Sequence, residues 1–220
     1  MVVYTAIFGD YDELLPPLVG KEVPHICFTD VPLQVDGWDV RRVVNVIIAN
    51  PQLAARMYKL LPHVWLPPHV WLPDADVSIW RDGNIQLAVP PDQFVETLGK
   101  HDIALFQHPL RDCIHEEAKA IVEFGKAPAS MVKEQAEQYR QIGYPEHHGL
   151  AATGVMVRCH NDNVNWLDNA WWSEVMRHTA RDQMSFDYVC WRLEMEYAII
   201  PGNDWDNELV VWSKHKALKQ

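Results

Sequence analysis

The sequence lacks the short motifs that mark several common enzyme classes. It contains neither GxGxxG nor GxxxxGK(S/T), the glycine patterns by which dinucleotide-binding and P-loop proteins hold phosphates. It has no GxSxG nucleophile elbow, and its four cysteines are widely spaced without a CxxC pair. These absences weigh against a dehydrogenase, a P-loop enzyme and a triad hydrolase. They also favour free thiols in a reducing compartment.

Long apolar runs and positive charge are scarce as well. No run is long enough to cross a bilayer, and the amino terminus lacks the basic region of a signal peptide, so we expect a cytoplasmic protein without a transmembrane segment. Lys and Arg number 19 against 30 Asp and Glu, which gives a net charge of -11. Such a chain repels nucleic acid and anionic membranes, so neither is expected as a partner. A phosphate ligand would have to meet clustered cations or a recruited metal.

Strand-like runs alternate with helical patterns along the 220 residues, which is typical of an α/β fold with a mostly parallel central sheet flanked by helices. Hydrophobic residues make up 48% of the chain and no interdomain linker is visible, so we predict one domain over residues 1–220. Predicted strands cover residues 2–8, 23–28, 40–48, 77–81, 102–106, 153–157 and 197–200. Predicted helices cover residues 51–61, 91–98, 112–124, 129–142 and 162–178, and Asp182 begins another short helix.

One hexapeptide occurs twice in succession. Residues 62–67 and 68–73 both read Pro-His-Val-Trp-Leu-Pro. Six residues are too few for a repeat that stacks a core, so we interpret the pair as a local duplication accommodated in a loop. We assign no metal to its histidines, His63 and His69.

Polar residues follow several of the predicted strands, where open α/β sheets bind ligands. The segment Asp82-Gly83-Asn84 ends a buried strand, and its two outer side chains could direct oxygen atoms at one hard cation. An Asp-Gly turn without a ligand is the plainer alternative. Similar strand ends carry Gly9-Asp10, Thr29-Asp30 and Gln107-His108.

Three further groups of polar residues have both a functional and a structural interpretation. Arg56 and Lys59 share one helix face, where they could meet phosphate oxygens or simply solvent. Asp182 could line a site or serve as a helix cap. His147 and His148 point in different directions, so at most one of them would line a site, and a buried structural histidine is the commoner outcome.

A set of short segments occurs in a particular order along the chain. They are Val3–Asp12, Cys27–Asp30, Ala55-Arg56 with Lys59, Pro62-His63, Leu72–Asp74, Ile79–Asn84, His108-Pro109 with Arg111–Cys113, Gly149-Leu150 with Thr153-Gly154, and Arg181–Gln183 with Ser185-Phe186. Together they resemble a glycosyltransferase-like family once catalogued as a domain of unknown function, with plant mucilage, plant cell-wall and bacterial members. That family is similar to GT-A glycosyltransferases, so the resemblance implies a GT-A-like nucleotide-sugar-binding fold over nearly the whole chain.

The resemblance also implies roles for individual residues. Asp82 and Asn84 stand in the place of an Asp-x-Asp motif that holds Mn²⁺ or Mg²⁺, and His215 is the candidate for a third metal ligand near the carboxyl end. Asparagine is neutral, so this site carries one negative charge fewer. The residues expected to bind the nucleotide-sugar are Thr5, Phe8, Gly9, Asp10, Tyr11, Asp30, Arg56, Lys59, His148, Thr153 and Gly154. The residues expected to be catalytic, lining the sugar or acceptor pocket, are Asp182, Gln183, His108 and Arg111.

The implied reaction is the transfer of a sugar from a nucleotide-diphosphate donor, with a UDP-sugar foremost, to a hydroxyl group of a glycan or polysaccharide. Two alternatives remain open from the residues alone. A metal-dependent hydrolase would use the same oxygen ligands and some of the 11 histidines to activate water. A non-catalytic carbohydrate-binding module would stack sugars on some of the ten tryptophans.

Overall fold

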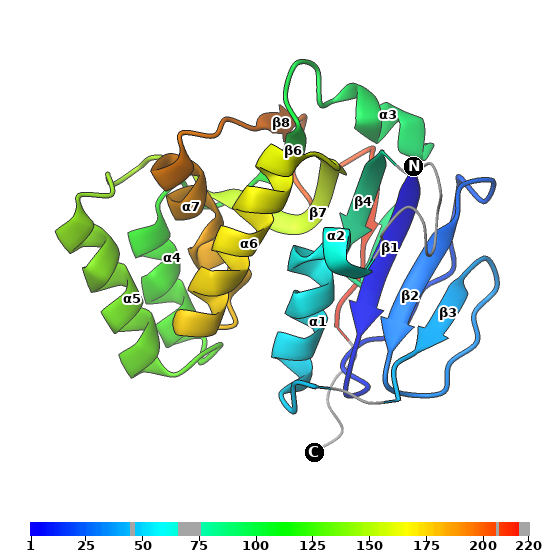
Figure 1. Cartoon of the computed structure of the whole chain (residues 1–220), viewed down its shortest axis with the longest axis horizontal. Coiled ribbons are helices and arrows are strands. Elements are labelled where there is room, and N and C mark those ends of the chain that lie inside the picture. Colours follow the sequence, from blue (N-terminus) through cyan, green and yellow to red (C-terminus); the bar gives the residue numbers. More distant parts are fainter. Residues whose placement is uncertain (45–46, 66–75, 206, 216–220) are drawn as a thin grey trace.

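The computed structural model describes residues 1–44, 47–65, 76–205 and 207–215. Its centre is a seven-stranded sheet with the order β3-β2-β1-β4-β7-β6-β8. Strand β7 pairs antiparallel with both of its neighbours, and every other pairing within this sheet is parallel. The predicted α/β architecture with a mostly parallel sheet and flanking helices is therefore confirmed (Figure 1).

The elements follow the predicted alternation closely. The strands are β1 Val2–Ile7, β2 His25–Thr29, β3 Asp39–Arg42, β4 Val77–Arg81, β5 Ile85–Leu87, β6 Ile103–Gln107, β7 Ala151–Cys159, β8 Ala198–Ile200 and β9 Val210–Trp212. The helices are α1 Pro51–Leu60, α2 Pro62–Trp65, α3 Pro91–Glu96, α4 Ile114–Glu123, α5 Ala129–Ile142, α6 Asp162–Arg177 and α7 Phe186–Leu193, with a 3₁₀ turn η1 at Asp182–Met184. Strands β5 and β9, which the sequence did not predict, form a separate antiparallel pair.

The sheet is covered on both faces because its strands are apolar on both sides. Successive residues of β1 point to opposite faces, so Tyr4 packs in one apolar core and Val3 in the other. The first core includes residues of α1, α4, α5, α6 and α7, and Figure 1 shows α1 and α6 side by side over the sheet. The second core includes Phe94 of α3 and residues of β5 and β9. No helix in the described ranges combines the length and the apolar character that a membrane span needs.

Helices α1 and α6 begin where the sequence places their caps. The Asn50 side chain accepts a hydrogen bond from the Leu53 N–H at 3.0 Å, and Asn161 accepts one from Val164 at 2.9 Å. Each asparagine satisfies a backbone donor that has no partner within the helix. The Asn50 cap therefore fixes where α1 begins, and with it the position of Arg56 and Lys59 along the helix.

Three local predictions are corrected by the structure. The strand predicted over residues 40–48 ends at Arg42, because its neighbour β2 ends at Thr29 and offers no further partner. The strand predicted over residues 153–157 extends over Ala151–Cys159, since it is paired on both sides by β4 and β6. The duplicated hexapeptide begins as the short helix α2 rather than as a loop, and its second copy lies outside the described residues.

Strand β7 carries an irregularity next to the strand ends. Its register with β6 jumps between Leu105, which pairs with Met156, and Phe106, which pairs with Ala152. Thr153 and Gly154 therefore bulge away from β6, while the Gly154 carbonyl still accepts a hydrogen bond from the Asp82 N–H at 2.8 Å. Bulges of this kind commonly redirect side chains beside binding sites.

Candidate active site

A cavity of about 460 Å³ lies at the carboxyl ends of β1 and β4. Because β7 runs in the opposite direction, its first residues reach the same edge of the sheet. The cavity is closed further by α1, by η1 and by the segment that leads into β9. Residues from six separate parts of the chain line it: Ala6–Gly9, Tyr11 and Asp12; Asn50–Gln52, Ala55 and Arg56; Trp80 and Asp82–Ile85; Thr153 and Gly154; Arg181–Gln183; and Asp204, Trp205, Trp212 and His215.

The loop after β4 is a turn that is held from behind by Arg81. The Ile85 N–H donates to the Asp82 carbonyl at 3.0 Å, which closes the turn. The buried Arg81 guanidinium donates to the carbonyls of Gly83, Ile85 and Leu15, and burial lowers the pKa of Arg81 to about 10. The segment Asp82-Gly83-Asn84 is thus an Asp-Gly turn and also part of the cavity wall, so the two interpretations of this motif do not exclude each other.

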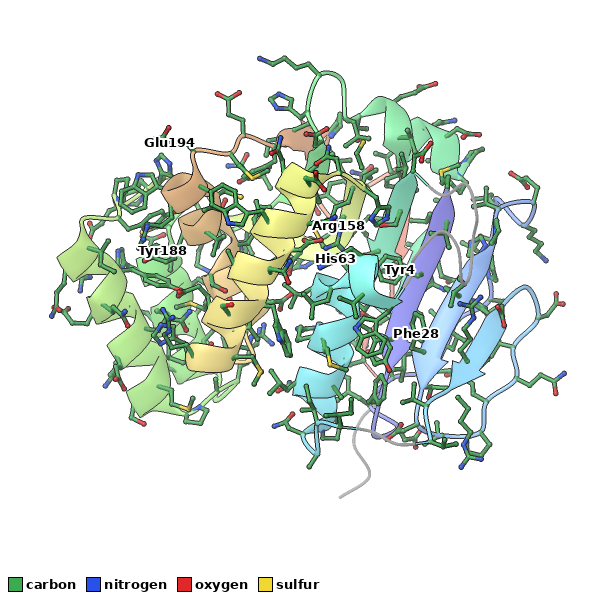
Figure 2. All side chains as sticks on the ribbon, in the orientation of Figure 1. Tyr4, Phe28, His63, Arg158, Tyr188 and Glu194 are labelled. Atoms are coloured by element: carbon green, nitrogen blue, oxygen red, sulfur yellow. The ribbon has the colours of Figure 1, made fainter. Side chains whose placement is uncertain are left out.

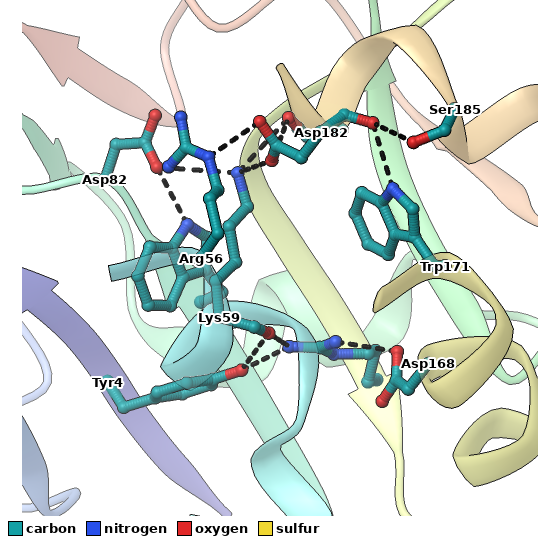
Figure 3. Close-up of polar contacts among 11 residues, drawn as sticks. Tyr4, Arg56, Lys59, Asp82, Asp168, Trp171, Asp182 and Ser185 are labelled. Carbon is teal, nitrogen blue, oxygen red and sulfur yellow. Dashed lines mark hydrogen bonds and ion pairs between the residues drawn. The ribbon is translucent and has the colours of Figure 1, made fainter. Parts of the chain in front are cut away.

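The two carboxylate oxygens of Asp82 have different surroundings. Oδ1 accepts a hydrogen bond from the indole N–H of Trp80 at 2.9 Å and lies 3.6 Å from Lys59 Nζ (Figure 3). Oδ2 lies toward Gly154, at 3.8 Å from the point where a Cβ on that glycine would sit. One oxygen is therefore fixed by the protein, and the other belongs to the cavity.

Asp182 is the centre of a buried charged network (Figure 3). Its Oδ1 lies 2.8 Å from Arg56 Nε, its Oδ2 lies 2.5 Å from Lys59 Nζ, and it accepts a hydrogen bond from the Thr153 hydroxyl at 3.0 Å. Burial would raise the pKa of Asp182, but Arg56, Lys59 and Arg181 outweigh it and hold that pKa well below its usual range. Asp182 is consequently a permanent anion that fixes cations, and it does not act as the helix cap that the sequence also allowed, because η1 has no side-chain cap.

A second buried cluster anchors the backbone of α1 at Lys59. The guanidinium of Arg158 pairs with Asp168 at 2.9 Å and also donates to the Lys59 carbonyl, and the Tyr4 hydroxyl donates to that carbonyl at 3.0 Å. Figure 2 shows Tyr4, Arg158 and His63 close together where α1, α2 and α6 meet. Burial lowers the pKa of His63, and the positive charge of Arg158 adds to the effect.

The carboxyl-terminal segment is tied to the β4 loop by backbone and side-chain contacts. The Asn84 amide donates to the Ser213 carbonyl at 2.8 Å, and the Ser213 N–H donates to the Asn84 carbonyl at 2.9 Å. The β5–β9 pairing continues this contact. It brings His215 to the cavity, where its Nδ1 lies 2.9 Å from the Asp12 carboxylate, and the hydrogen bond to Asp12 raises the pKa of His215.

Asp204 is a cavity residue that the sequence did not mark. It is 7% exposed, and its Oδ1 is buried with no hydrogen-bond partner among the described residues. Its Oδ2 lies 2.9 Å from the point where a Gly154 Cβ would sit, so it shares this space with Asp82. Burial raises the pKa of Asp204 to about 6, and the nearby charge of Asp82 adds to the effect.

The cavity brings together most of the residues implied by the resemblance. All three proposed metal ligands line it, together with six of the nucleotide-sugar residues and two of the catalytic residues: Asp82, Asn84, His215, Phe8, Gly9, Tyr11, Arg56, Thr153, Gly154, Asp182 and Gln183. Seven others are not among its lining residues: Thr5, Asp10, Asp30, Lys59, His148, His108 and Arg111.

Four of these seven contact or directly adjoin in sequence residues that line the cavity. Lys59 is completely buried beneath the cavity, so the predicted solvated or phosphate-facing position is corrected to one that holds Asp182 and Asp82. Thr5 is buried within β1. Asp10 follows Gly9 in the exit loop of β1, and Asp30 accepts the Gly9 N–H at 3.0 Å, which fixes that loop.

His108, Arg111 and His148 are not among the lining residues, although His108 packs against one of them. Strand β6, which ends at Gln107, is separated from β4 by β7 in the sheet, so its carboxyl end does not border the same cavity. Arg111 pairs with the buried Glu117 at 2.7 Å, and His108 packs edge-on against the ring of Trp205 at 6.0 Å. Burial and Arg111 lower the pKa of His108 to about 4. His148 lines a separate groove beside α7.

Comparison with known sequences identifies the family. The model of the TOD1/MUCI70 family, described as a glycosyltransferase-like domain, matches residues 26–201. The chain belongs to this family. Among curated proteins it is similar to the probable hexosyltransferase MUCI70 of Arabidopsis thaliana, with 27% identity over an alignment of 219 residues. The alignment covers 86% of this chain. The chain spans 37% of the length of that relative.

Two solved glycosyltransferases share a distant structural likeness with this member of the family. The bifunctional glycosyltransferase WbbM in its apo form aligns with a TM-score of 0.46 at 10% identity, covering 91% of this chain and 38% of WbbM. Mouse xyloside xylosyltransferase 1, also in its apo form, aligns with a TM-score of 0.45 at 9% identity, covering 90% of this chain and 84% of the mouse protein.

Proposed function

We propose that this protein transfers a sugar from a nucleotide-diphosphate sugar to a hydroxyl group of a glycan acceptor, with Mn²⁺ or Mg²⁺ as cofactor. The observation that carries the proposal is one cavity at the carboxyl ends of β1 and β4 in which Asp82 and Asn84 lie beside Arg56. A site with oxygen ligands and a fixed guanidinium suits a diphosphate bridged by a cation. Membership in a glycosyltransferase-like family and the name of the plant relative support glycosyl transfer, with a hexose as the sugar class to test first.

The cavity residues fit a divalent cation. A Cβ on Gly154 would lie 2.9 Å from an Asp204 carboxylate oxygen, 3.8 Å from one of Asp82 and 2.8 Å from Ile85 Cδ1, so two carboxylates approach this glycine closely. His215 presents Nδ1 to Asp12, which leaves Nε2 as a ligand atom, an arrangement typical of metal-binding histidine. The amide nitrogen of Asn84 donates a hydrogen bond to the Ser213 carbonyl, so the side-chain oxygen of Asn84 remains for the cation.

Asp82, Asn84 and His215 would hold the cation, which would supply positive charge to neutralise the departing diphosphate.

Fixed positive charge from the protein complements this site. Arg56 lines the cavity, and its Nε is paired with Asp182, which holds the guanidinium in one place. Because Asp182 remains ionised and is saturated by Arg56, Lys59 and Thr153, it is unsuited to take a proton from the acceptor hydroxyl. We assign it the positioning of Arg56, and we assign Gln183 to hydrogen bonds with the sugar.

The loop after β1 provides a place for the nucleoside. Phe8, Gly9 and Tyr11 line the cavity, and Gly9 has a φ of +67° with no room for a Cβ, which would lie 2.8 Å from Pro51. Asp30 then fixes the Gly9 backbone. A loop so constrained forms a rigid wall without requiring the ligand to order it, and a UDP-sugar is the donor to test first.

The glycan acceptor would enter over the exposed aromatic side of the cavity. Trp205 and Trp212 line it and remain 47% and 39% exposed. Indole faces pack well against the C–H faces of sugar rings. We therefore place the acceptor across these two residues and the donor against the loop after β1.

A thermal-shift screen of nucleotide-sugars tests this proposal directly. We expect one nucleotide family to stabilise the protein, and to do so more strongly with Mn²⁺, because a ligand at 100 times its Kd adds about 2.7 kcal/mol to folding stability. Product analysis with the best donor should then show the sugar on an acceptor glycan rather than free in solution. Hydrolysis of substrates without any nucleotide would instead favour the metal-dependent hydrolase. Glycan binding that needs neither metal nor nucleotide would favour the carbohydrate-binding module.

A further inference from the structure

The carboxylate of Asp204 is not explained by the contacts around it. Asp204 belongs to the segment between β8 and β9, is 7% exposed and lines the cavity. Its Oδ1 has no hydrogen-bond partner among the described residues. A buried carboxylate oxygen without a donor lowers folding stability unless a ligand or ion satisfies it. The oxygen is therefore either a defect of the fold or one half of a contact that forms only on binding.

A second carboxylate borders the same part of the cavity as Asp204. Oδ2 of Asp204 and Oδ2 of Asp82 lie 2.9 Å and 3.8 Å from one common point, the position of a Cβ on Gly154. Two carboxylates that border one small space repel each other unless a proton or a cation lies between them. Ile85 Cδ1 also lies 2.8 Å from that point, so only a residue without a side chain fits there, and the bulge in β7 places Gly154 at this position.

We propose that the carboxylates of Asp204 and Asp82 together hold the divalent cation beside Gly154. This inference takes its cation from the proposed function and adds a ligand that the Asp-Gly-Asn motif does not contain. Asn84 is neutral, so the motif alone supplies one negative charge. Asp204 restores the second charge from a distant part of the sequence, and the pairing of β5 with β9 holds the intervening segment in place. Proteins commonly hold Mg²⁺ through one or two carboxylates together with the phosphates of the substrate.

The test measures Mn²⁺ binding by the full chain, with and without UDP, from the electron paramagnetic resonance signal of the free ion. Asp204→Asn is nearly isosteric, and we expect it to weaken Mn²⁺ binding at least about tenfold, since even the loss of an outer-shell partner commonly costs that much. Asp92→Asn is the matched control. Asp92 is exposed on α3 and is not among the residues that line the cavity, so we expect its substitution to leave binding unchanged.

The unsubstituted protein offers a second measurement that does not depend on the folding of a variant. With Fe²⁺ in place of Mn²⁺, ascorbate and peroxide generate radicals that cut the backbone beside the bound metal. We expect cuts near both Asp82 and Asp204. Cleavage near Asp82 alone, or equal Mn²⁺ affinity in Asp204→Asn, would overturn the role of Asp204.

The outcomes separate this inference from the proposed function. Equal Mn²⁺ affinity in Asp204→Asn, together with metal-dependent sugar transfer by the unsubstituted protein, would remove Asp204 from the site and leave the function standing. Mn²⁺ binding that needs both Asp82 and Asp204, without turnover of any nucleotide-sugar, would uphold the site and reject the function. No binding of Mn²⁺ by the unsubstituted protein, even with UDP, would overturn the inference.

Discussion

Lys59 and Asp182 form an ion pair with 2.5 Å between Nζ and Oδ2, and both side chains are almost completely buried. Asp182 is shared with Arg56, so one carboxylate fixes two cations at the base of the cavity. Because the chain is acidic overall, positive charge beside a phosphate site has to be fixed locally, and one carboxylate does this for two cations. The pair joins α1 to η1, which are far apart in the sequence. The shape of the cavity therefore depends on both segments being folded.

Removal of Asp182 should destabilise the protein strongly. In Asp182→Asn, Lys59 would remain buried with its main counter-charge gone, and the loss of one partner from a buried pair typically costs about 3–5 kcal/mol. Urea denaturation should show a lower midpoint with an unchanged slope. The exposed pair of Arg140 and Glu137 is the matched control, because Arg140→Ala should cost less than about 1 kcal/mol. A similar loss in both variants would mean that the buried pair has no special role.

Substitution of Asp82 should abolish activity and leave the fold intact. Asp82 is partly exposed, and its fixed contacts are the Trp80 indole and Lys59 at 3.6 Å, so Asp82→Ala leaves fewer buried groups unpaired than a change at Asp182. We expect a near-native circular dichroism spectrum, a Tm within a few degrees of the unsubstituted protein, and no sugar transfer with Mn²⁺ supplied. Asp92→Asn serves again as the control. Normal turnover by Asp82→Ala would contradict the proposed metal site.

A methyl group on Gly154 should block the space beside the Asp82 and Asp204 carboxylates. The added Cβ would lie 2.8 Å from Ile85 Cδ1 and 2.9 Å from the Asp204 carboxylate, which is closer than ordinary contacts allow. Overpacking of this kind costs about 1–3 kcal/mol, so Gly154→Ala should lower the Tm and also lose its stabilisation by Mn²⁺. In Gly125→Ala the new Cβ meets open space but the backbone φ is +61°, so that variant should lose stability and keep the full Mn²⁺ response. A retained Mn²⁺ response in Gly154→Ala would argue against a cation beside this residue.

Much of the fold and part of the site could be predicted from the sequence, because both depend on local patterns. Apolar runs with capped helices between them gave the order of the elements, and residues that directly follow β1 and β4 reached the cavity as expected. The strand-end argument did not anticipate that His108 and Arg111 are missing from the cavity lining, because sequence does not reveal that β7 lies between β4 and β6. Asp204 was missed for a related reason. It follows a three-residue strand, and only the long-range pairing of β5 with β9 brings its segment to the β4 loop.

Loss of the Trp205 side chain should weaken acceptor binding without affecting the donor. Trp205 is 47% exposed at the cavity wall and is supported edge-on by His108. Loss of a stacked aromatic ring from a sugar is expected to raise the acceptor KM several-fold, with the donor KM and the Mn²⁺ response unchanged. Trp166→Ala is the matched control, since Trp166 is 58% exposed on α6 and is not among the lining residues. A change in the donor KM of Trp205→Ala, with the acceptor KM preserved, would place the nucleotide on the aromatic side and reverse the proposed orientation of the two substrates.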